Sequence, residues 1–279
     1  MKKHLATIVF FGLALASAAH AAPAGEPTNA KEAAEKKIAQ DKRTDELYQQ
    51  KFATLSPERQ AWEKVLQENL GNGFYLPAHK RDFVAGRSTA WDFVADDPRL
   101  PRVLIIGDSI SRGYTMATRS ALAGKANVHR APENCGPTAN GLKKVDTWLG
   151  QGKWDVITWN FGIHDRNTPP ATYKANLETL VKRLQQTGAK IIWVRTTPAP
   201  AGTNNEKFTD AQCDFLNATA DEVMKANHVS EVDLFALVKP KLAELQLTNN
   251  VHFKEEGYQL MGGEMAKAIL GVAKKSGAK

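Results

Sequence analysis

The stretch VLIIGDSISRGY, residues 103–114, decides the fold of this chain. Its first four residues are large and apolar, which is typical of a strand buried on both faces of a sheet. Gly107 ends the strand, and the pair Asp108-Ser109 stands where a helix begins. A serine at such a corner exposes its hydroxyl at the sheet edge, and its N–H lies at a helix N-terminus, which favours an anion. An ordinary helix N-cap uses the same residue types, so the tripeptide alone leaves both interpretations open.

The regions that follow alternate between apolar strands and helical patterns. Strands are predicted at residues 102–106, 127–130, 155–160, 190–196 and 229–234. The clearest helix places Tyr173, Leu177 and Leu184 on one face, and Gly188 lies beyond its end. Strands that alternate with helices predict a parallel sheet covered on both faces. We therefore expect a three-layer α/β/α domain over residues 100–275, with a mostly parallel five-stranded sheet.

The N-terminus has the pattern of a secretory signal peptide. Lys2 and Lys3 precede an apolar run, residues 5–16, that is too short to span a bilayer as a stable helix. The small residues Ala19 and Ala21 predict cleavage after residue 21, with an uncleaved membrane anchor as the alternative. We expect residues 1–21 to be removed and the mature protein to be periplasmic or secreted, without stable membrane insertion.

Residues 22–99 form a predicted extension before the main domain. Residues 22–55 are rich in Ala, Lys and Glu, which indicates a mobile lead or a loosely packed helix. Ser56-Pro57 predicts a helix start, with Ser56 as N-cap, and Gly71 is a plausible end for that helix. Residues 72–100 are aromatic without clear periodicity, and we expect an irregular segment that wraps the main domain.

Composition argues against several classes of function. The formal charge of +7 falls to +5 when Lys2 and Lys3 leave with the signal peptide, and the chain contains no dense basic run. Nucleic-acid binding is therefore not favoured. Zinc-type spacing and glycine-rich phosphate loops are also missing from the sequence, so we expect neither a metal nor a cofactor. Cys135 and Cys213 could form one disulfide in an oxidising compartment, but their spacing does not decide it.

Polar residues and glycines follow the predicted strands. Ligands of open α/β sheets bind beyond the carboxyl ends of the strands, so these residues are candidates for a site. Gly136 follows the second strand and allows a close backbone approach, although a plain turn explains it equally well. Asn160 and His164 follow the third strand, and either could donate to an oxyanion. His252 precedes the last helical segment and is a candidate base for Ser109.

These four blocks, in this order, resemble the SGNH (GDSL-like) hydrolase superfamily over about residues 100–275, and in particular a bacterial exported subgroup. Gly107-Asp108-Ser109 is similar to the nucleophile block. Gly136 is similar to the second-block glycine whose N–H enters the oxyanion hole, with Gly141 as the alternative. Gly162-Ile163-His164-Asp165 is similar to the third block, and His252 to the last-block histidine. The resemblance implies a flavodoxin-like fold and a cofactor-free serine esterase.

The chain departs from the family pattern at two positions. The third block usually reads Gly-x-Asn-Asp, but His164 occupies the Asn position. The side-chain oxyanion donor is then His164 or Asn160, and we favour Asn160 because an amide donates without needing a particular tautomer.

The last block usually reads Asp-x-x-His, but Asn249 occupies the Asp position and cannot carry the charge that stabilises an imidazolium. Replacing that Asp by Asn costs on the order of 10⁴ in turnover in a serine protease. The protein would then work as a slower Ser–His dyad, or recruit another acid, or not catalyse. The acids considered are Glu255, Glu256 and Asp165.

The sequence therefore predicts an exported serine esterase. In this interpretation Ser109 attacks the ester carbonyl and His252 takes its proton. Asn249 stands at the position of the third catalytic residue, and which group orients His252 stays open. Acetyl esters on carbohydrate are the first expectation, with Trp91, Trp148 and Trp159 as residues that could line a sugar site. Two alternatives stay open: a catalytically silent glycan-binding protein of the same fold, and an O-acyltransferase. Sequence does not separate hydrolysis from transfer.

Overall fold

The computed structural model describes residues 26–199 and 209–273. The chain divides into two units, residues 1–43 and residues 44–279. The predicted signal peptide, residues 1–21, lies outside the described residues. Among the described helices, none is long and apolar enough to cross a membrane. Cys135 and Cys213 are both buried and not bonded to each other, so the disulfide that the sequence left open is not formed.

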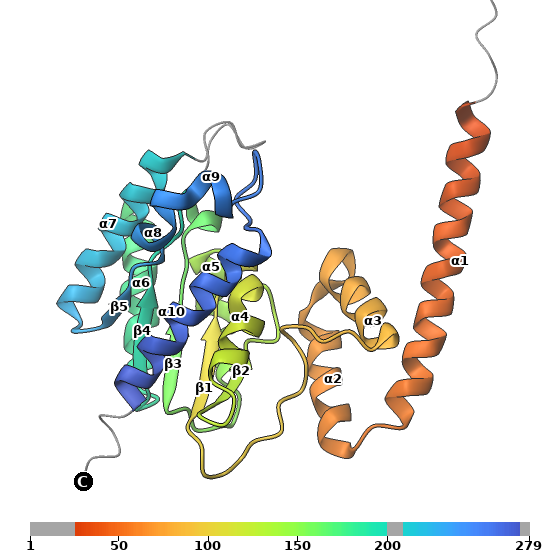
Figure 1. Cartoon of the computed structure of the whole chain (residues 1–279), viewed down its shortest axis with the longest axis horizontal. Coiled ribbons are helices and arrows are strands. Elements are labelled where there is room, and N and C mark those ends of the chain that lie inside the picture. The colour runs from red at the N-terminus through yellow and green to blue at the C-terminus, as the bar shows by residue number, and fades with distance from the viewer. Residues whose placement is uncertain (1–25, 200–208, 274–279) are drawn as a thin grey trace, which may run out of the picture. The chain divides into compact units, whose positions relative to one another are not determined.

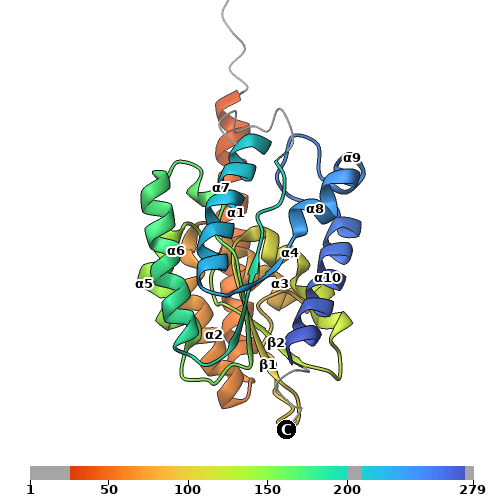
Figure 2. The ribbon, with the colours of Figure 1, turned by 90° about the vertical axis from the view of Figure 1, so that its left-hand side faces the viewer.

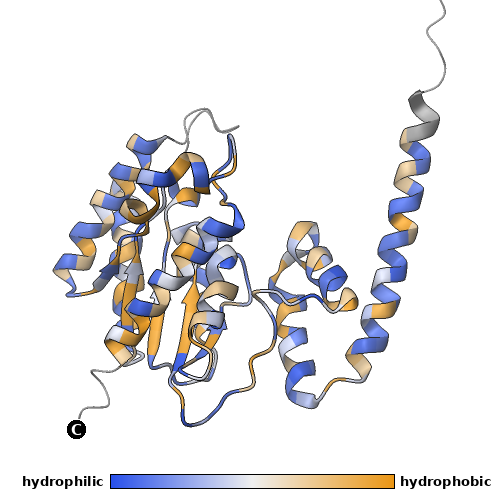
Figure 3. Ribbon diagram, in the orientation of Figure 1, coloured by the Kyte–Doolittle hydropathy of each residue, from blue (hydrophilic) through white to orange (hydrophobic). Residues whose placement is uncertain are grey.

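A five-stranded parallel sheet forms the centre of the second unit (Figure 1), as the sequence predicted. The strands are β1 (Arg102–Ile106), β2 (Asn127–Arg130), β3 (Val156–Trp159), β4 (Lys190–Val194) and β5 (Ser230–Val232). Their order is β2-β1-β3-β4-β5. The first two strands have the predicted bounds, and the other three are slightly shorter than predicted. Figure 3 shows β1 and β3, near the middle of the sheet, as largely hydrophobic ribbons between more polar helices, which is the pattern of a sheet covered on both faces.

Helices cover both faces of the sheet (Figure 2). One layer contains α4 (Ser109–Ala121), α8 (Leu234–Val238) and α10 (Glu255–Ala273), with the short α9 (Leu242–Leu245) against α10. The other layer contains α5 (Thr138–Leu149), α6 (Pro170–Gln185) and α7 (Asp210–Ala226). The predicted periodic helix is α6.

Glycines allow α4 and α10 to pack closely. A Cβ added at Gly113 would lie 2.1 Å from the ring of Tyr258, and one at Gly262 would lie 2.4 Å from the Cβ of Ala117. Gly113, which has no evident role in the sequence, therefore makes room for an aromatic ring of α10. This packing matters for function because Ser109 begins α4 and His252 shortly precedes α10.

The extension is more regular than its sequence indicated. Residues 26–53 form α1 (Glu26–Ala53), the helical one of the two predicted alternatives, and Ser56 caps α2 (Pro57–Asn69) as predicted. The prediction of an irregular segment from residue 72 was wrong in its first part. That part contains a π-helical turn, Gly71–Tyr75, followed by α3 (Leu76–Ala85). Pro77 lies in the first turn of α3, and Gly86, with a φ of +70°, ends it, so both helix signals were present.

The rest of the aromatic segment packs on the main domain, as predicted. The indole N–H of Trp91 donates to the carbonyl oxygen of Ala131, 3.2 Å away at the end of β2. Arg119 on α4 donates to the carbonyl oxygens of Thr89 and Ala90, each at 3.0 Å. Trp91 also joins a small core of its own, which contains Leu66, Leu70 and Leu76. Residues 89–91 are therefore attached to the end of β2 and to α4.

Candidate active site

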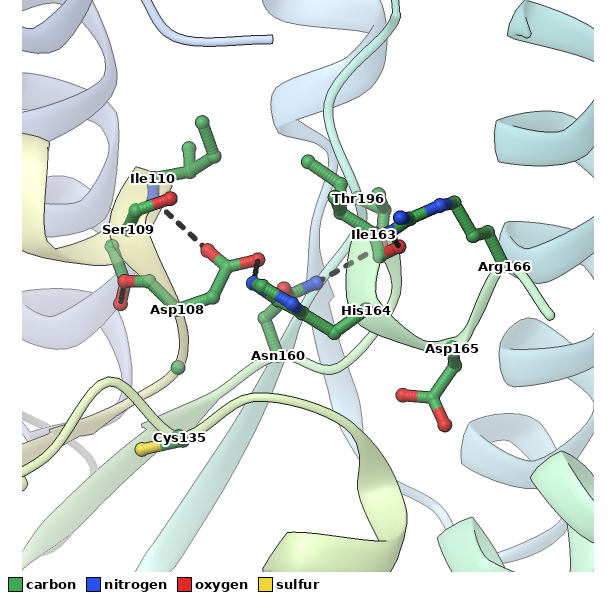
Figure 4. A network of polar contacts seen from close by, with 12 residues as sticks. Asp108, Ser109, Ile110, Cys135, Asn160, Ile163, His164, Asp165, Arg166 and Thr196 are labelled. Atoms are coloured by element: carbon green, nitrogen blue, oxygen red, sulfur yellow. Dashed lines mark hydrogen bonds and ion pairs between the residues drawn. The ribbon is translucent and has the colours of Figure 1, made fainter. Parts of the chain in front are cut away.

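The turn from β1 to α4 presents Ser109. Asp108 is the N-cap of α4, and its side chain accepts a hydrogen bond from the N–H of Ile110 at 2.9 Å (Figure 4). Ser109 is the first helical residue and its side chain is half-buried. Gly107 is required here, because an added Cβ would lie 2.8 Å from Oγ of Ser111. Asp108 thus accounts for the N-cap, and the hydroxyl of the adjacent Ser109 is not used in capping.

Arg130, at the end of β2, holds this turn in place. It is buried, and its guanidinium donates to the carbonyl oxygens of Gly107 and Asp108 at 3.0 and 2.9 Å. A third hydrogen bond, of 2.7 Å, reaches Oγ of Ser111. Sequence reasoning did not identify this residue, although a lone arginine at the end of a buried strand is a usable signal, since a buried cation needs partners.

His252 contacts Ser109 across 143 positions of sequence. Its Nε2 lies 2.8 Å from Oγ of Ser109, as the predicted Ser–His pair requires. Burial lowers the pKa of His252, the nearby charge of Asp108 opposes this shift, and Arg112 lowers the pKa further. A lowered pKa leaves the imidazole neutral at neutral pH, so it can accept a proton.

Asn250 determines which nitrogen of His252 carries the proton. Its Oδ1 accepts the backbone N–H of His252 at 3.0 Å and lies 2.7 Å from Nδ1 of the same residue. A backbone N–H can only donate, so the amide must present its oxygen to both groups. Nδ1 therefore carries the hydrogen, and the lone pair of Nε2 faces Ser109. The neighbouring amide thus selects the tautomer that a general base needs.

The contact predicted for Asn249 is made by Asn250. Asn249 occupies the left-handed region, with a φ of +52°, and its side chain makes no hydrogen bond within the described residues. A tight turn brings the side chain of Asn250, not that of Asn249, to the ring of His252. In this turn the backbone N–H of Asn250 donates to the carbonyl oxygen of Leu247, and the N–H of Leu247 donates to the carbonyl oxygen of His252. Two adjacent asparagines look alike in sequence, and only the turn geometry distinguishes them.

The three acids considered as substitutes do not contact His252. Asp165 is buried and accepts from Oγ1 of Thr138 at 2.6 Å and from Oγ1 of Thr168 at 3.1 Å, so it joins two loops. Glu255 accepts from Gln259, and neither it nor Glu256 pairs with His252 within the described residues. The carboxylate that does act on His252 through its charge is Asp108.

Two backbone N–H groups are available at this corner. Those of Ser109 and Gly136 donate to no acceptor in the described parts of the chain. Gly136 has a φ of +66°, and the N–H of its neighbour Cys135 bonds to the carbonyl oxygen of Gly107 at 3.2 Å, which holds this loop beside the nucleophile turn. Gly141, the alternative, lies inside α5, where an added Cβ would meet the ring of Phe161 at 2.8 Å. Its role is packing.

Asn160, the favoured side-chain donor, has its amide engaged elsewhere. Its amide nitrogen donates to the carbonyl oxygen of Val194 at 2.7 Å and to Oγ1 of Thr196 at 3.1 Å, which occupies both N–H groups. His164 is more open, with 35% of its side chain exposed, and its Nε2 lies 3.9 Å from the carboxylate of Asp108 (Figure 4). Of the two predicted donors, His164 is the one with free capacity.

The three tryptophans considered for a sugar site lie in different surroundings. Trp148 and Trp159 pack in the main core, whereas Trp91 lines a cavity between the extension and α4. Within the described residues, no group of three or more His, Cys, Asp or Glu side chains is placed to hold a metal ion.

The comparisons with known proteins agree with this geometry. A lipase/acylhydrolase from Enterococcus faecalis is similar in structure, with a TM-score of 0.56 and 24% sequence identity over 62% of this chain and 96% of that one. The acetyl xylan esterase AlAXEase has a TM-score of 0.53 and 15% identity, over 60% of this chain and 99% of its own. An acetylxylan esterase from Geobacillus stearothermophilus has a TM-score of 0.51 and 17% identity, over 62% and 94% of the two chains.

At such identities the solved structures show a shared fold. No curated protein sequence matches the chain. The sequence model of the GDSL-like lipase/acylhydrolase family matches residues 105–260, which is more than half of the chain and contains Ser109, Gly136, His164 and His252. The chain therefore belongs to the GDSL-like lipase/acylhydrolase family.

Proposed function

We propose that this protein is an exported serine esterase in which Ser109 is the nucleophile and His252 the general base. The observation that carries the proposal is the 2.8 Å contact between Oγ of Ser109 and Nε2 of His252, with the tautomer of the imidazole set by Asn250. Such a pair is the minimum needed to activate a serine hydroxyl.

The reaction divides into acylation and deacylation. Oγ of Ser109 forms a bond to the ester carbonyl carbon while its proton moves to Nε2 of His252. The N–H groups of Ser109 and Gly136, with His164, hold the oxyanion. The bond from carbon to the alcohol oxygen then breaks, and the alcohol leaves with the proton from Nε2. Water attacks the acyl-serine in the same way, which releases the acid and restores both residues.

The chemistry resembles that of a dyad more than that of a full triad. The amide of Asn250 orients His252 but carries no negative charge, so the imidazolium that forms during acylation lacks a paired carboxylate. The charge of Asp108 favours the protonated imidazole, without a hydrogen bond to it. We therefore propose an esterase slower than one with the usual Asp.

Acetylated carbohydrate is the proposed substrate class. Two solved structures of the same fold are named as acetylxylan esterases, and this likeness motivates the proposal of acetyl esters. The predicted signal peptide supports a periplasmic or secreted enzyme, where polysaccharide esters occur.

Hydrolysis of p-nitrophenyl acetate tests the proposal. Wild-type protein should release p-nitrophenol, Ser109→Ala should not, and Ser120→Ala is a matched control because Ser120 is exposed on the same helix. A fluorophosphonate should label Ser109 in the wild type only. Full activity in Ser109→Ala would contradict the proposal.

The second candidate is a silent glycan-binding protein, which the uncharged Asn250 favours. It predicts no fluorophosphonate label, no ester turnover, and retained binding to an acetylated xylan. Acyl transfer instead of hydrolysis would appear as an acetylated sugar when a free oligosaccharide is added as acceptor.

A further inference from the structure

A cavity of about 310 Å³ lies between the extension, α4 and the first turn of α10. Arg112, which lines it, follows Ser109 by one helical turn, so their side chains share a face of α4. Tyr258 lines it from α10, and its hydroxyl accepts the backbone N–H of Phe253, the residue after His252. The cavity is therefore connected to both members of the pair through neighbouring residues, Arg112 and Tyr258.

Arg112 has no polar partner. Its guanidinium carbon lies 5.6 Å from the ring centre of Tyr75 and 5.7 Å from that of Trp91. Within the described residues the side chain makes no hydrogen bond or ion pair, and its buried Nε has no partner. Two aromatic rings hold the cation in place, and the N–H groups in its plane stay free.

The other charged and titratable groups in this cavity are engaged. Asp82 is bound by Arg87, whose Nη2 lies 2.6 Å from its carboxylate. His79 pairs with the buried Glu63 at 2.9 Å. Glu255 accepts a hydrogen bond from Gln259, 2.6 Å away. Arg112 is therefore the lining cation that lacks an acceptor.

We propose that Arg112 binds an anionic oxygen group of the ester substrate, a carboxylate or a phosphate, in this cavity. The proposal rests on the proposed esterase function and specifies its substrate class. A guanidinium presents parallel N–H donors that match both groups, and each such charged hydrogen bond is strong when water is partly excluded.

The aromatic residues around Arg112 come from a part of the chain that the family match does not include. Tyr75 and Trp91, which hold Arg112, belong to the extension and precede the family match at residues 105–260. The extension thus supplies one wall of the cavity, and α4, the helix that Ser109 begins, supplies another. The effect of the Arg112 charge on the pKa of His252 agrees with this proximity.

Matched pairs of esters test the proposal. p-Acetoxybenzoate and the neutral p-acetoxybenzamide place the charge on the alcohol side, whereas p-nitrophenyl hydrogen succinate and p-nitrophenyl succinamate place it on the acyl side. p-Acetoxyphenyl phosphate distinguishes phosphate from carboxylate. The measured quantity is the ratio of kcat/KM for each anionic ester to that of its neutral partner, with p-acetoxybenzamide also serving for the phosphate.

We expect Arg112→Gln to lower this ratio by about tenfold for at least one anionic ester, mainly through KM, because a charged hydrogen bond is lost. Arg112→Lys should retain part of the ratio, since it keeps the charge but not the planar fork. Glu255→Gln should raise the ratio, because it removes a like charge from the same cavity. Arg99→Gln, at an exposed arginine paired with Asp97, is the control and should leave the ratio unchanged.

Equal ratios in wild type and Arg112→Gln for all three anionic esters would overturn the proposal. Calorimetric titration with p-hydroxybenzoate and with inorganic phosphate measures anion binding without turnover, so it tests the role of Arg112 separately from the esterase function. Binding that depends on Arg112, without turnover that depends on Ser109, would overturn the esterase function alone. Turnover that depends on Ser109 with no such binding or ratio change would overturn the role of Arg112 alone.

Discussion

At the scale of single residues, Asn250 performs one of the two tasks of a triad acid. Its carbonyl oxygen orients His252 and selects the tautomer, because the backbone N–H of His252 fixes the direction of the amide. It cannot perform the second task, the stabilisation of the imidazolium by a full negative charge. A substitution at this position therefore separates the two tasks.

Asn250→Asp should raise kcat for p-nitrophenyl acetate by roughly tenfold or more, because it adds a charge to a geometry already in place. Asn250→Ala should lower kcat, since Nδ1 loses its acceptor and both tautomers become accessible. Asn249→Asp is the matched control, because the side chain of Asn249 makes no hydrogen bond within the described residues. A larger gain in Asn249→Asp than in Asn250→Asp would show that the contact is assigned to the wrong asparagine.

The pH dependence follows from the lowered pKa of His252. Burial is the main cause of the lower pKa, and the positive charge of Arg112 lowers the pKa further. The acid limb of kcat/KM should therefore have its midpoint below the usual value of about 6.5. In Arg112→Gln the limb should move to higher pH, because a nearby positive charge is gone. The unfolded chain binds this proton more readily, so the free energy of unfolding should also decrease as pH falls below about 6.5. An acid limb that does not move in Arg112→Gln would contradict the assigned proximity.

At the scale of elements, the packing of α4 on α10 positions the two reactive residues. Ser109 begins one helix and His252 precedes the other, so the distance between them depends on how closely these helices approach. Gly113 sets that approach, because its missing side chain leaves room for the ring of Tyr258. Catalysis and helix packing should therefore respond together to a change at this glycine.

Gly113→Ala should destabilise the fold by about 1–3 kcal/mol, the usual cost of overpacking, and should also lower kcat. Gly263→Ala is the matched control in α10, where an added Cβ meets nothing within 4 Å. The control should raise the free energy of unfolding by about 0.5–1 kcal/mol, because alanine favours the helix. Urea denaturation with parallel activity assays measures both effects, and equal behaviour of the two variants would rule out the packing argument.

At the scale of the whole molecule, residues 44–99 of the extension belong to the same compact unit as the sheet. Trp91 is buried, bonds to the end of β2 and belongs to the small core under α2 and α3. The buried carboxylate of Glu63 accepts from Tyr48 and lies 2.9 Å from His79, which joins the end of α1 to α2 and α3. Residues 44–99 are thus connected to one another and to the sheet.

Trp91→Ala should lower the free energy of unfolding by about 3–5 kcal/mol, because a large buried side chain and its hydrogen bond are lost. It should also weaken the discrimination of anionic esters, since the ring holds Arg112. Phe74→Ala is the control, because Phe74 is 65% exposed and should change stability by less than about 0.5 kcal/mol. Chemical denaturation followed by circular dichroism measures the difference, and a small effect at Trp91 would mean that the extension is only loosely attached.

The sequence by itself determined the sheet, the family and the two candidate residues Ser109 and His252. Buried parallel strands are near-continuous apolar runs, so β1 could be predicted to the residue. The bounds predicted for the short β2 also match, although its sequence NVHR is mostly polar. Ser109 and His252 were found because each follows a local signal, a strand end or a helix start, and because the blocks occur in a known order. Local patterns of this kind need no knowledge of distant contacts.

Only the tertiary structure decided which polar atoms meet. The choice of Asn250 over Asn249 depends on a turn, and the exclusion of Asn160 depends on acceptors at the end of β4. Arg130 and Arg112 were missed because their roles come from carbonyl groups and aromatic rings remote in sequence. Hydrogen bonds and cavities form between segments that folding brings together, so side-chain chemistry alone identifies candidates for a site, and packing decides which of them belong to it.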